Sequence, residues 1–138
     1  KYNVQNSSFL DEIHQGSVSF EYLNYLYSNL GLSLGVTELW DTYTLSEPIH
    51  KIHLRTFEIP MCGGLQIAPY SKELSGYFEE NKEIIFFENE MDLVEKSKFY
   101  LSDRNSQVRK EMKIKARIRA ENDHSWSSRF KQLHDEIF

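Results

Sequence analysis

The sequence predicts an α/β fold in which a parallel sheet is flanked by helices. Segments with helical spacing alternate with short apolar segments of strand length, in the order helix, strand, helix, strand, helix, strand, and then three helices. The composition fits one folded domain, because 40% of the 138 residues are hydrophobic and 14% are aromatic. Only three strands are clear, residues 1–15 predict no regular element, and the chain begins with Lys1 rather than Met. We therefore expect residues 1–138 to form a single, truncated domain of a longer protein.

The first part of the chain predicts a helix, a strand and a long loop. Ser17 or Ser19 can cap a helix over 19–28, in which apolar side chains recur at helical spacing. Residues 30–36 alternate small and apolar residues, which predicts a short buried strand. Residues 37–52 are rich in loop-forming types, and a loop of this length in a compact domain is often functional.

The middle of the chain predicts two short helices and two strands. A helix over 54–62 would end at a Gly-Gly turn, although Pro60 is tolerated there only in the first turn or as a kink. Strands are predicted over 65–68 and 83–87, with a short helix over 72–78 between them. The second of these strands is rich in β-branched and aromatic residues.

Three helices close the chain. They are predicted over 89–101 (beginning at its first or second residue), 105–121 and 125–137. Trp126 and Phe130 share one stripe of the last helix, so we expect them in the core, where they dock that helix. The histidine just before the helix would cap or orient it.

Charge patterning leaves one surface of interest. The net charge of −5 argues against a dedicated nucleic-acid binder. Residues 104–119, however, hold seven cations against Glu111 alone. A basic helix can touch phosphate or an anionic membrane surface, at the inner face of a membrane for example. The simpler interpretation, a solvated helix face, is the one we favour.

Other features narrow the class of protein. Cys62 is the single cysteine, so we expect a small packing residue, no internal disulfide and a reducing, cytoplasmic compartment. Neither a signal-peptide pattern nor an apolar run near the roughly 20 residues of a membrane span is found. The five histidines show no His-x-x-x-His spacing, so no metal site is expected.

Residues 50–64 are the stretch whose composition carries chemistry. They follow the long loop, open a helix and close on Gly-Gly before a strand, and ligands of open parallel sheets bind beyond the carboxyl ends of strands. Lys51, His53 and Arg55 stand at the helix start, where cations and free amides would suit a diphosphate. Glu58, one turn further on, is an acceptor suited to the vicinal hydroxyls of a ribose. The alternative is that these are ordinary surface polar groups.

A resemblance to a known family adds to this interpretation. Residues 55–64 read Arg-Thr-Phe-Glu-Ile-Pro-Met-Cys-Gly-Gly and resemble the Arg-x-Phe-Glu-x-x-x-x-Gly-Gly signature of CgeB-like, spore-maturation-type glycosyltransferases. Residues 70–87 and the closing His-x-Trp-x-x-Arg at 124–129 are also similar to segments of that family. The likeness runs from about residue 16 to residue 130, with the motifs in the same order.

The resemblance implies a glycosyltransferase of two facing Rossmann-like domains, whose C-terminal domain binds a nucleoside-diphosphate sugar. This chain would be most of that C-terminal half, ending in two or three helices, and the missing N-terminal domain would bind the acceptor. A hexosyl-type transfer to an acceptor hydroxyl of a cell-envelope glycan or a protein is implied, with no metal and no cofactor. No catalytic residue is assigned, and we expect the fragment alone to bind nucleotide weakly without turnover. The alternative is a non-catalytic module that docks a partner or an anionic membrane through residues 104–119.

The same resemblance assigns residues within the site. Glu58 would hold the ribose, as the second glutamate of the related Glu-x7-Glu motif, while His50 stands at the position of the first and would face the donor sugar. Gly16 and Val18 resemble a turn whose backbone lies against the nucleobase. The donor diphosphate would be bound by Lys51, His53, Leu54, Arg55 and Thr56.

Overall fold

The computed structural model describes residues 16–39, 42, 45–46 and 49–138, so the expectation for residues 1–15 lies outside the described part. Its centre is a three-stranded parallel sheet in the order β1-β2-β3. The strands are β1 (Ser33–Leu34), β2 (Gln66–Pro69) and β3 (Ile85–Phe87). In register, Ser33 lies opposite Gln66 and Ile67 lies opposite Ile85. The parallel sheet flanked by helices, predicted from the alternation of elements, is confirmed.

The described residues contain five α-helices. They are α2 (Phe20–Asn29), α3 (Arg55–Met61), α4 (Glu90–Leu101), α5 (Ser106–Asp123) and α6 (Trp126–Ile137). Side-chain oxygens of Ser19, Asn89 and Ser125 cap α2, α4 and α6 by accepting from a backbone N–H in the first turn. These caps explain why the predicted starts of the three helices agree with the structure.

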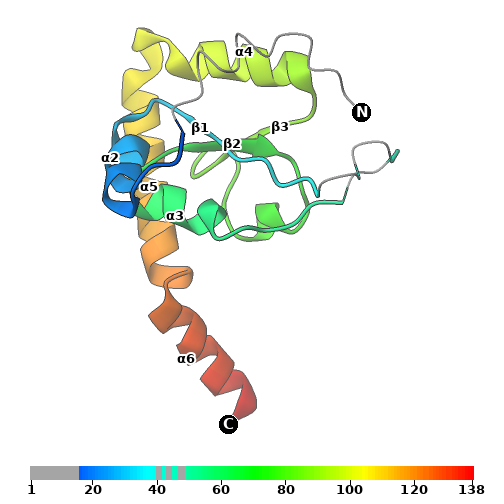
Figure 1. Cartoon of the computed structure of the whole chain (residues 1–138), viewed down its shortest axis with the longest axis vertical. Coiled ribbons are helices and arrows are strands. Elements are labelled where there is room, and N and C mark those ends of the chain that lie inside the picture. The colour runs from blue at the N-terminus through cyan, green and yellow to red at the C-terminus, as the bar shows by residue number, and fades with distance from the viewer. Residues whose placement is uncertain (1–15, 40–41, 43–44, 47–48) are drawn as a thin grey trace.

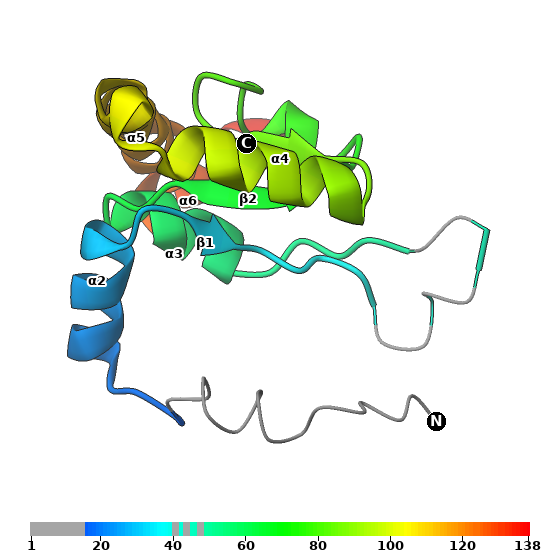
Figure 2. The ribbon, with the colours of Figure 1, turned by 90° about the horizontal axis from the view of Figure 1, so that it is seen from above.

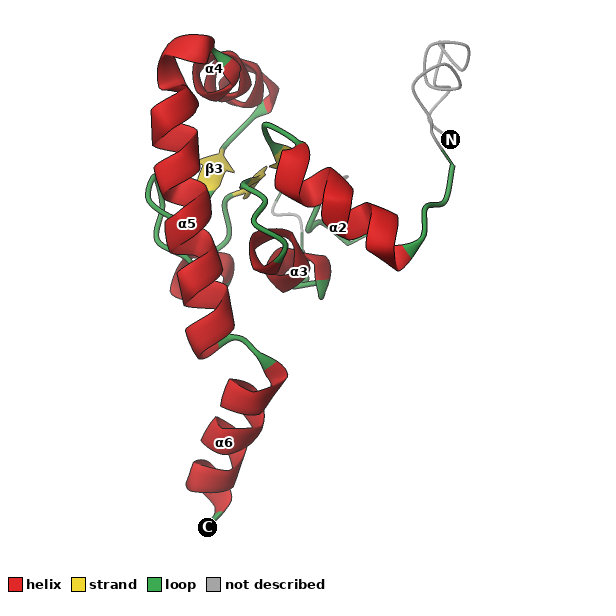
Figure 3. Ribbon diagram, turned by 90° about the vertical axis from the view of Figure 1, so that its left-hand side faces the viewer, coloured by secondary structure: helices red, strands yellow, loops and turns green. Residues whose placement is uncertain are grey.

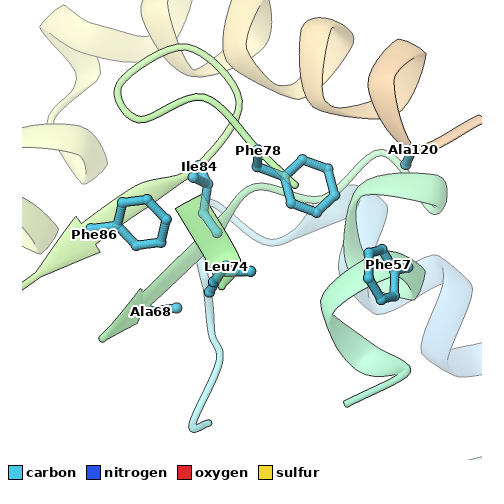
Figure 4. Close-up of a cluster of buried hydrophobic side chains, with 7 residues drawn as sticks. All are labelled: Phe57, Ala68, Leu74, Phe78, Ile84, Phe86 and Ala120. Carbon is cyan, nitrogen blue, oxygen red and sulfur yellow. The ribbon is translucent and has the colours of Figure 1, made fainter. Parts of the chain in front are cut away.

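The helices form two layers on opposite faces of the sheet. Figures 1 and 3 show α4 over one face and α3 against the other, and Figure 2 shows α4 crossing over the sheet while α2 stands to one side. The face toward α3 carries the cluster Phe57, Ala68, Leu74, Phe78, Ile84, Phe86 and Ala120 (Figure 4). The face toward α4 carries Leu65, Ile67, Ile85, Tyr100 and Met112. Successive strand residues alternate between the clusters, as the pleat requires, and α5 contributes to both.

Two predicted elements differ from the structure. The strand expected over 30–36 is paired only at Ser33–Leu34, because the chain beyond it turns into the long loop. The helix expected over 72–78 is a single 3-10 turn, Leu74–Gly76. The Leu74 N–H donates to the Ser71 hydroxyl, and the Leu74 side chain is buried in the core.

Pro60 lies in the last turn of α3, whereas we expected it to be tolerated only in the first turn or as a kink. Because proline has no N–H, α3 lacks at most one hydrogen bond, the one to the Thr56 carbonyl. The Pro60 carbonyl accepts from the Gly63 N–H at 2.8 Å. Gly63 has φ +75°, the left-handed conformation that commonly ends a helix and that glycine adopts without strain.

The expectation that Trp126 and Phe130 dock α6 in the core is wrong. The two side chains are 65% and 63% exposed, and α6 has no buried residue. Their rings stack on each other at 5.8 Å between centroids, and α6 continues away from the sheet beyond α5 (Figure 1). His124 orients this junction instead, since its Nε2 lies 3.0 Å from the Tyr77 carbonyl and its ring packs on Phe57.

Candidate functional site

A pocket of about 510 Å³ lies beyond the carboxyl end of β1. Its walls come from three separate segments: the chain that follows β1, the start of α3 and the first residue of β2. They are formed by Gly35, Val36, Thr37, His53, Leu54, Arg55, Thr56, Glu58 and Gln66. This is the position where open parallel sheets bind ligands.

Pairing at the two ends of the long loop builds the pocket. Glu38 and His50 form an antiparallel bridge, and the Lys51 N–H donates to the Thr37 carbonyl at 2.7 Å. The Thr37 hydroxyl also lies 2.9 Å from His50 Nδ1. These bonds hold the segment before α3 beside the segment after β1, and in Figure 1 the two run next to each other. The loop between them lies partly outside the described residues.

The structure gathers most, but not all, of the residues predicted for the site. His53, Leu54, Arg55, Thr56 and Glu58 line the pocket. His50 and Lys51 are not among the residues that line it, and the ring of His50 is engaged by Thr37.

Gly16 and Val18 are exposed, lie before α2 and are not brought to the pocket. Gly16 has φ +74°, which agrees with the predicted turn. Their predicted contact with a nucleobase stays a prediction.

The start of α3 has fewer free amides than the sequence suggested. The Thr56 N–H donates to the His53 carbonyl at 3.0 Å, and the Phe57 N–H donates to the Leu54 carbonyl at 2.9 Å. Since α3 has only seven residues, its dipole is also small. The exposed guanidinium of Arg55 therefore carries more of the site's positive character than the backbone does, and the exposed ring of His53 adds a hydrogen-bonding group beside it.

Glu58 connects the pocket to a smaller one of about 110 Å³ beside it. The second pocket is lined by Leu54, Phe57, Glu58, Met61, His124, Trp126 and Arg129. The Arg129 guanidinium lies 4.3 Å from the centroid of the Phe57 ring. Glu58 is half-buried, so its carboxylate is confined between the two pockets and still accessible.

The Glu58 carboxylate affects the pKa of the Cys62 thiol. Burial raises the pKa of Cys62, and the negative charge of Glu58 raises it further. A thiol with a raised pKa is a poor nucleophile at neutral pH. This fits the predicted packing role of Cys62.

The sequence-based prediction missed four lining residues: Gly35, Val36, Thr37 and Gln66. Thr37 and Gly35 lie in stretches assigned to a loop and a strand, with no signal of a ligand nearby. Gln66 did carry a signal, because it interrupts the apolar run Leu-Gln-Ile-Ala of a buried strand. A polar residue in such a strand needs a partner, and that requirement could have drawn attention to it.

The basic segment 104–119 is largely paired within the chain. Lys113 Nζ donates to the Leu30 and Ser28 carbonyls, at 2.7 and 3.2 Å. Arg109 donates to the carbonyl of Tyr100, in the last turn of α4, and to that of Ser102. Arg117 and Arg119 pair with the carboxylates of Glu121, Asp123 and Glu83. Four of the seven cations are thus engaged by the domain itself.

Metal-binding clusters and membrane-spanning helices are both absent from the described residues. In that part of the chain, no cluster of three or more His, Cys, Asp or Glu side chains has the arrangement of a metal site. None of the helices found there is both long and apolar enough to span a bilayer. The predicted absence of a metal requirement stays a prediction.

Comparison with protein families identifies a match for nearly the whole chain. Residues 6–135 match the model of a family described as glycosyl transferase-like. No curated protein and no solved structure matches the sequence.

Proposed function

The chain belongs to the glycosyl transferase-like family, and from this premise we propose that the pocket beyond β1 binds the nucleoside-diphosphate sugar that donates the glycosyl group. The observation that carries the proposal is the gathering of His53, Arg55 and Glu58 around one pocket. Three segments distant in sequence build that pocket at the ligand-binding end of a parallel sheet.

Basic and acidic side chains would bind different parts of the donor in this pocket. Arg55 and His53 stand at its open side and would bind the diphosphate, which gains negative charge as the glycosidic bond breaks. Glu58 would accept hydrogen bonds from the two ribose hydroxyls, a use suited to an accessible carboxylate. Catalysis would then rest on positioning and on stabilising the leaving group.

His50 has a supporting function in this proposal. Its ring is engaged by the Thr37 hydroxyl, so it would hold the two ends of the loop together rather than touch the donor sugar. Lys51 supports the same junction through its backbone N–H.

The acceptor and the cellular setting are further parts of the proposal. A missing acceptor domain would supply any general base, and a cytoplasmic enzyme that modifies a cell-envelope glycan or a protein would fit the resemblance. Docking through residues 104–119 is less well supported, because four cations there already have partners in the chain.

Isothermal calorimetry with UDP and GDP tests the proposal. We expect weak but measurable binding of one of them and no turnover of its sugar conjugate by this chain. Glu58→Gln should weaken binding by about tenfold or more, because a hydrogen bond to a charged acceptor is lost. Glu136→Gln, on the exposed end of α6, is the matched control and should leave the affinity unchanged. No binding of either nucleotide, or equal binding by both variants, would contradict the proposal.

A further inference from the structure

Gln66 is a buried polar residue that lines the pocket without a partner for its carbonyl group. The residue is 4% exposed and lines the pocket. Its Oε1 is buried but accepts no hydrogen bond within the described residues. The hydroxyl of Ser33, opposite Gln66 in the sheet register, is also buried and unpaired there. Buried polar atoms in folded proteins nearly always have a partner, so this pair calls for an explanation.

The backbone around Gln66 is shaped to keep its carboxamide at the pocket. A Cβ placed on Gly35 would lie only 2.0 Å from Gln66 Nε2 and 2.9 Å from its Cδ. Any side chain at position 35 would therefore displace the carboxamide. Gly35 lines the same pocket, so the glycine leaves room for the amide group at the end of β1.

We propose that Gln66 is a specificity-determining residue of the donor pocket, whose carboxamide hydrogen-bonds an uncharged N–H or O–H group of the bound nucleotide sugar. This inference rests on the proposed function. The partner is uncharged because the Arg55 guanidinium is exposed, where a diphosphate stays partly hydrated, whereas Gln66 is buried at 4% exposure. An unpaired carbonyl oxygen requires a donor, and a neutral amide cannot balance a buried charge.

Two parts of a nucleotide sugar offer such a group: the edge of the base and the hydroxyls of the sugar. The Gln66→Met variant keeps the length of the side chain and removes both of its polar atoms. The matched control is Gln107→Met, the same change on the exposed surface of α5. Calorimetry with UDP, GDP, ADP and UDP-glucose measures the affinity of each protein for each probe.

The expected result is a loss of at least fivefold in affinity for the preferred probe in Gln66→Met and no change in Gln107→Met. An equal loss for UDP and UDP-glucose, with less discrimination among the bases, identifies the base as the partner. A loss for UDP-glucose alone identifies the sugar. Unchanged affinities in Gln66→Met overturn the inference and leave the proposed function standing, whereas a wild-type chain that binds none of the probes overturns both.

A measurement on the wild-type chain keeps the inference testable if Gln66→Met fails to fold. The side-chain NH₂ signals of Gln66 in a ¹⁵N–¹H spectrum should shift on saturation with the preferred nucleotide, while those of Gln107 serve as the internal reference. Signals of Gln66 that stay in place at saturation would overturn the inference. That result would assign the two orphan polar atoms to a buried water or to each other.

Discussion

Two cationic regions of this domain look alike in the sequence and differ in the structure. Around the pocket, the side chains of His53 and Arg55 are exposed and border an open volume of about 510 Å³. Along α5, Lys113 and its neighbours turn back onto carbonyls and carboxylates of the same chain. Residues 104–119 therefore hold more cations than the pocket, but more of these cations already have partners within the chain. A count of cations identifies a binding surface only when their internal partners are known.

The largest expected effect lies on α5 and concerns stability. Lys113→Ala removes a cation that donates to the Ser28 carbonyl in the last turn of α2 and to the carbonyl of the C-cap Leu30, and should lower the free energy of unfolding by about 1–3 kcal/mol. Lys110→Ala, an exposed change on the same helix, should cost less than about 0.5 kcal/mol. Urea denaturation measures both. Equal, small effects would mean that α5 presents a free basic surface after all.

The next effect lies at the pocket and concerns binding. Arg55→Gln should weaken nucleoside-diphosphate binding by about tenfold while the urea midpoint stays close to that of the wild type, because Arg55 is exposed. Arg104→Gln is the control, at the exposed edge of the basic segment. A larger loss of affinity in Arg104→Gln than in Arg55→Gln would move the binding surface to α5.

A smaller effect concerns the pH dependence of the Cys62 thiol. Burial and then the charge of Glu58 raise its pKa in the folded state, so alkylation by iodoacetamide should begin at higher pH than for a free cysteine. By the same linkage, the stabilisation from this thiol is complete below its unfolded pKa and is lost as the pH rises through its folded pKa. Glu58→Gln should shift the alkylation profile to lower pH, because the charge that raises the pKa of Cys62 is removed. An unchanged profile would mean that the Glu58 carboxylate does not affect the pKa of this thiol.

The smallest effect is expected on α6. Trp126→Ser should change the stability of this chain by less than about 0.5 kcal/mol, because the indole is 65% exposed and stacks only on Phe130 among its aromatic neighbours. Phe57→Leu, in the core beside α3, is the contrasting variant and should cost more than 1 kcal/mol. A loss of similar size in Trp126→Ser would show that the indole itself packs on the domain in solution.

The sequence predicted those features that depend on local chemistry. The serine and asparagine caps placed the starts of α2, α4 and α6, and the apolar runs placed β2 and β3. The residues on either side of the α3 start were also found, because their cations and carboxylate stand next to a Gly-Gly turn.

Features that depend on distant partners were not predictable in the same way. The stripe with Trp126 and Phe130 requires an apolar partner, but the pattern does not say whether this chain supplies it. The pairing of Lys113 with α2 joins residues more than 80 positions apart. Gln66 was visible as a polar break in a strand, yet only the fold reveals that it faces a pocket.

Chemical-shift mapping with UDP and GDP tests most directly whether the pocket beyond β1 is the nucleotide site. Addition of the preferred nucleotide should shift backbone amide signals of residues 35–37, 53–58 and 66, while those of 104–119 stay in place. Shifts concentrated on residues 104–119, with the pocket signals unchanged, would contradict the assignment.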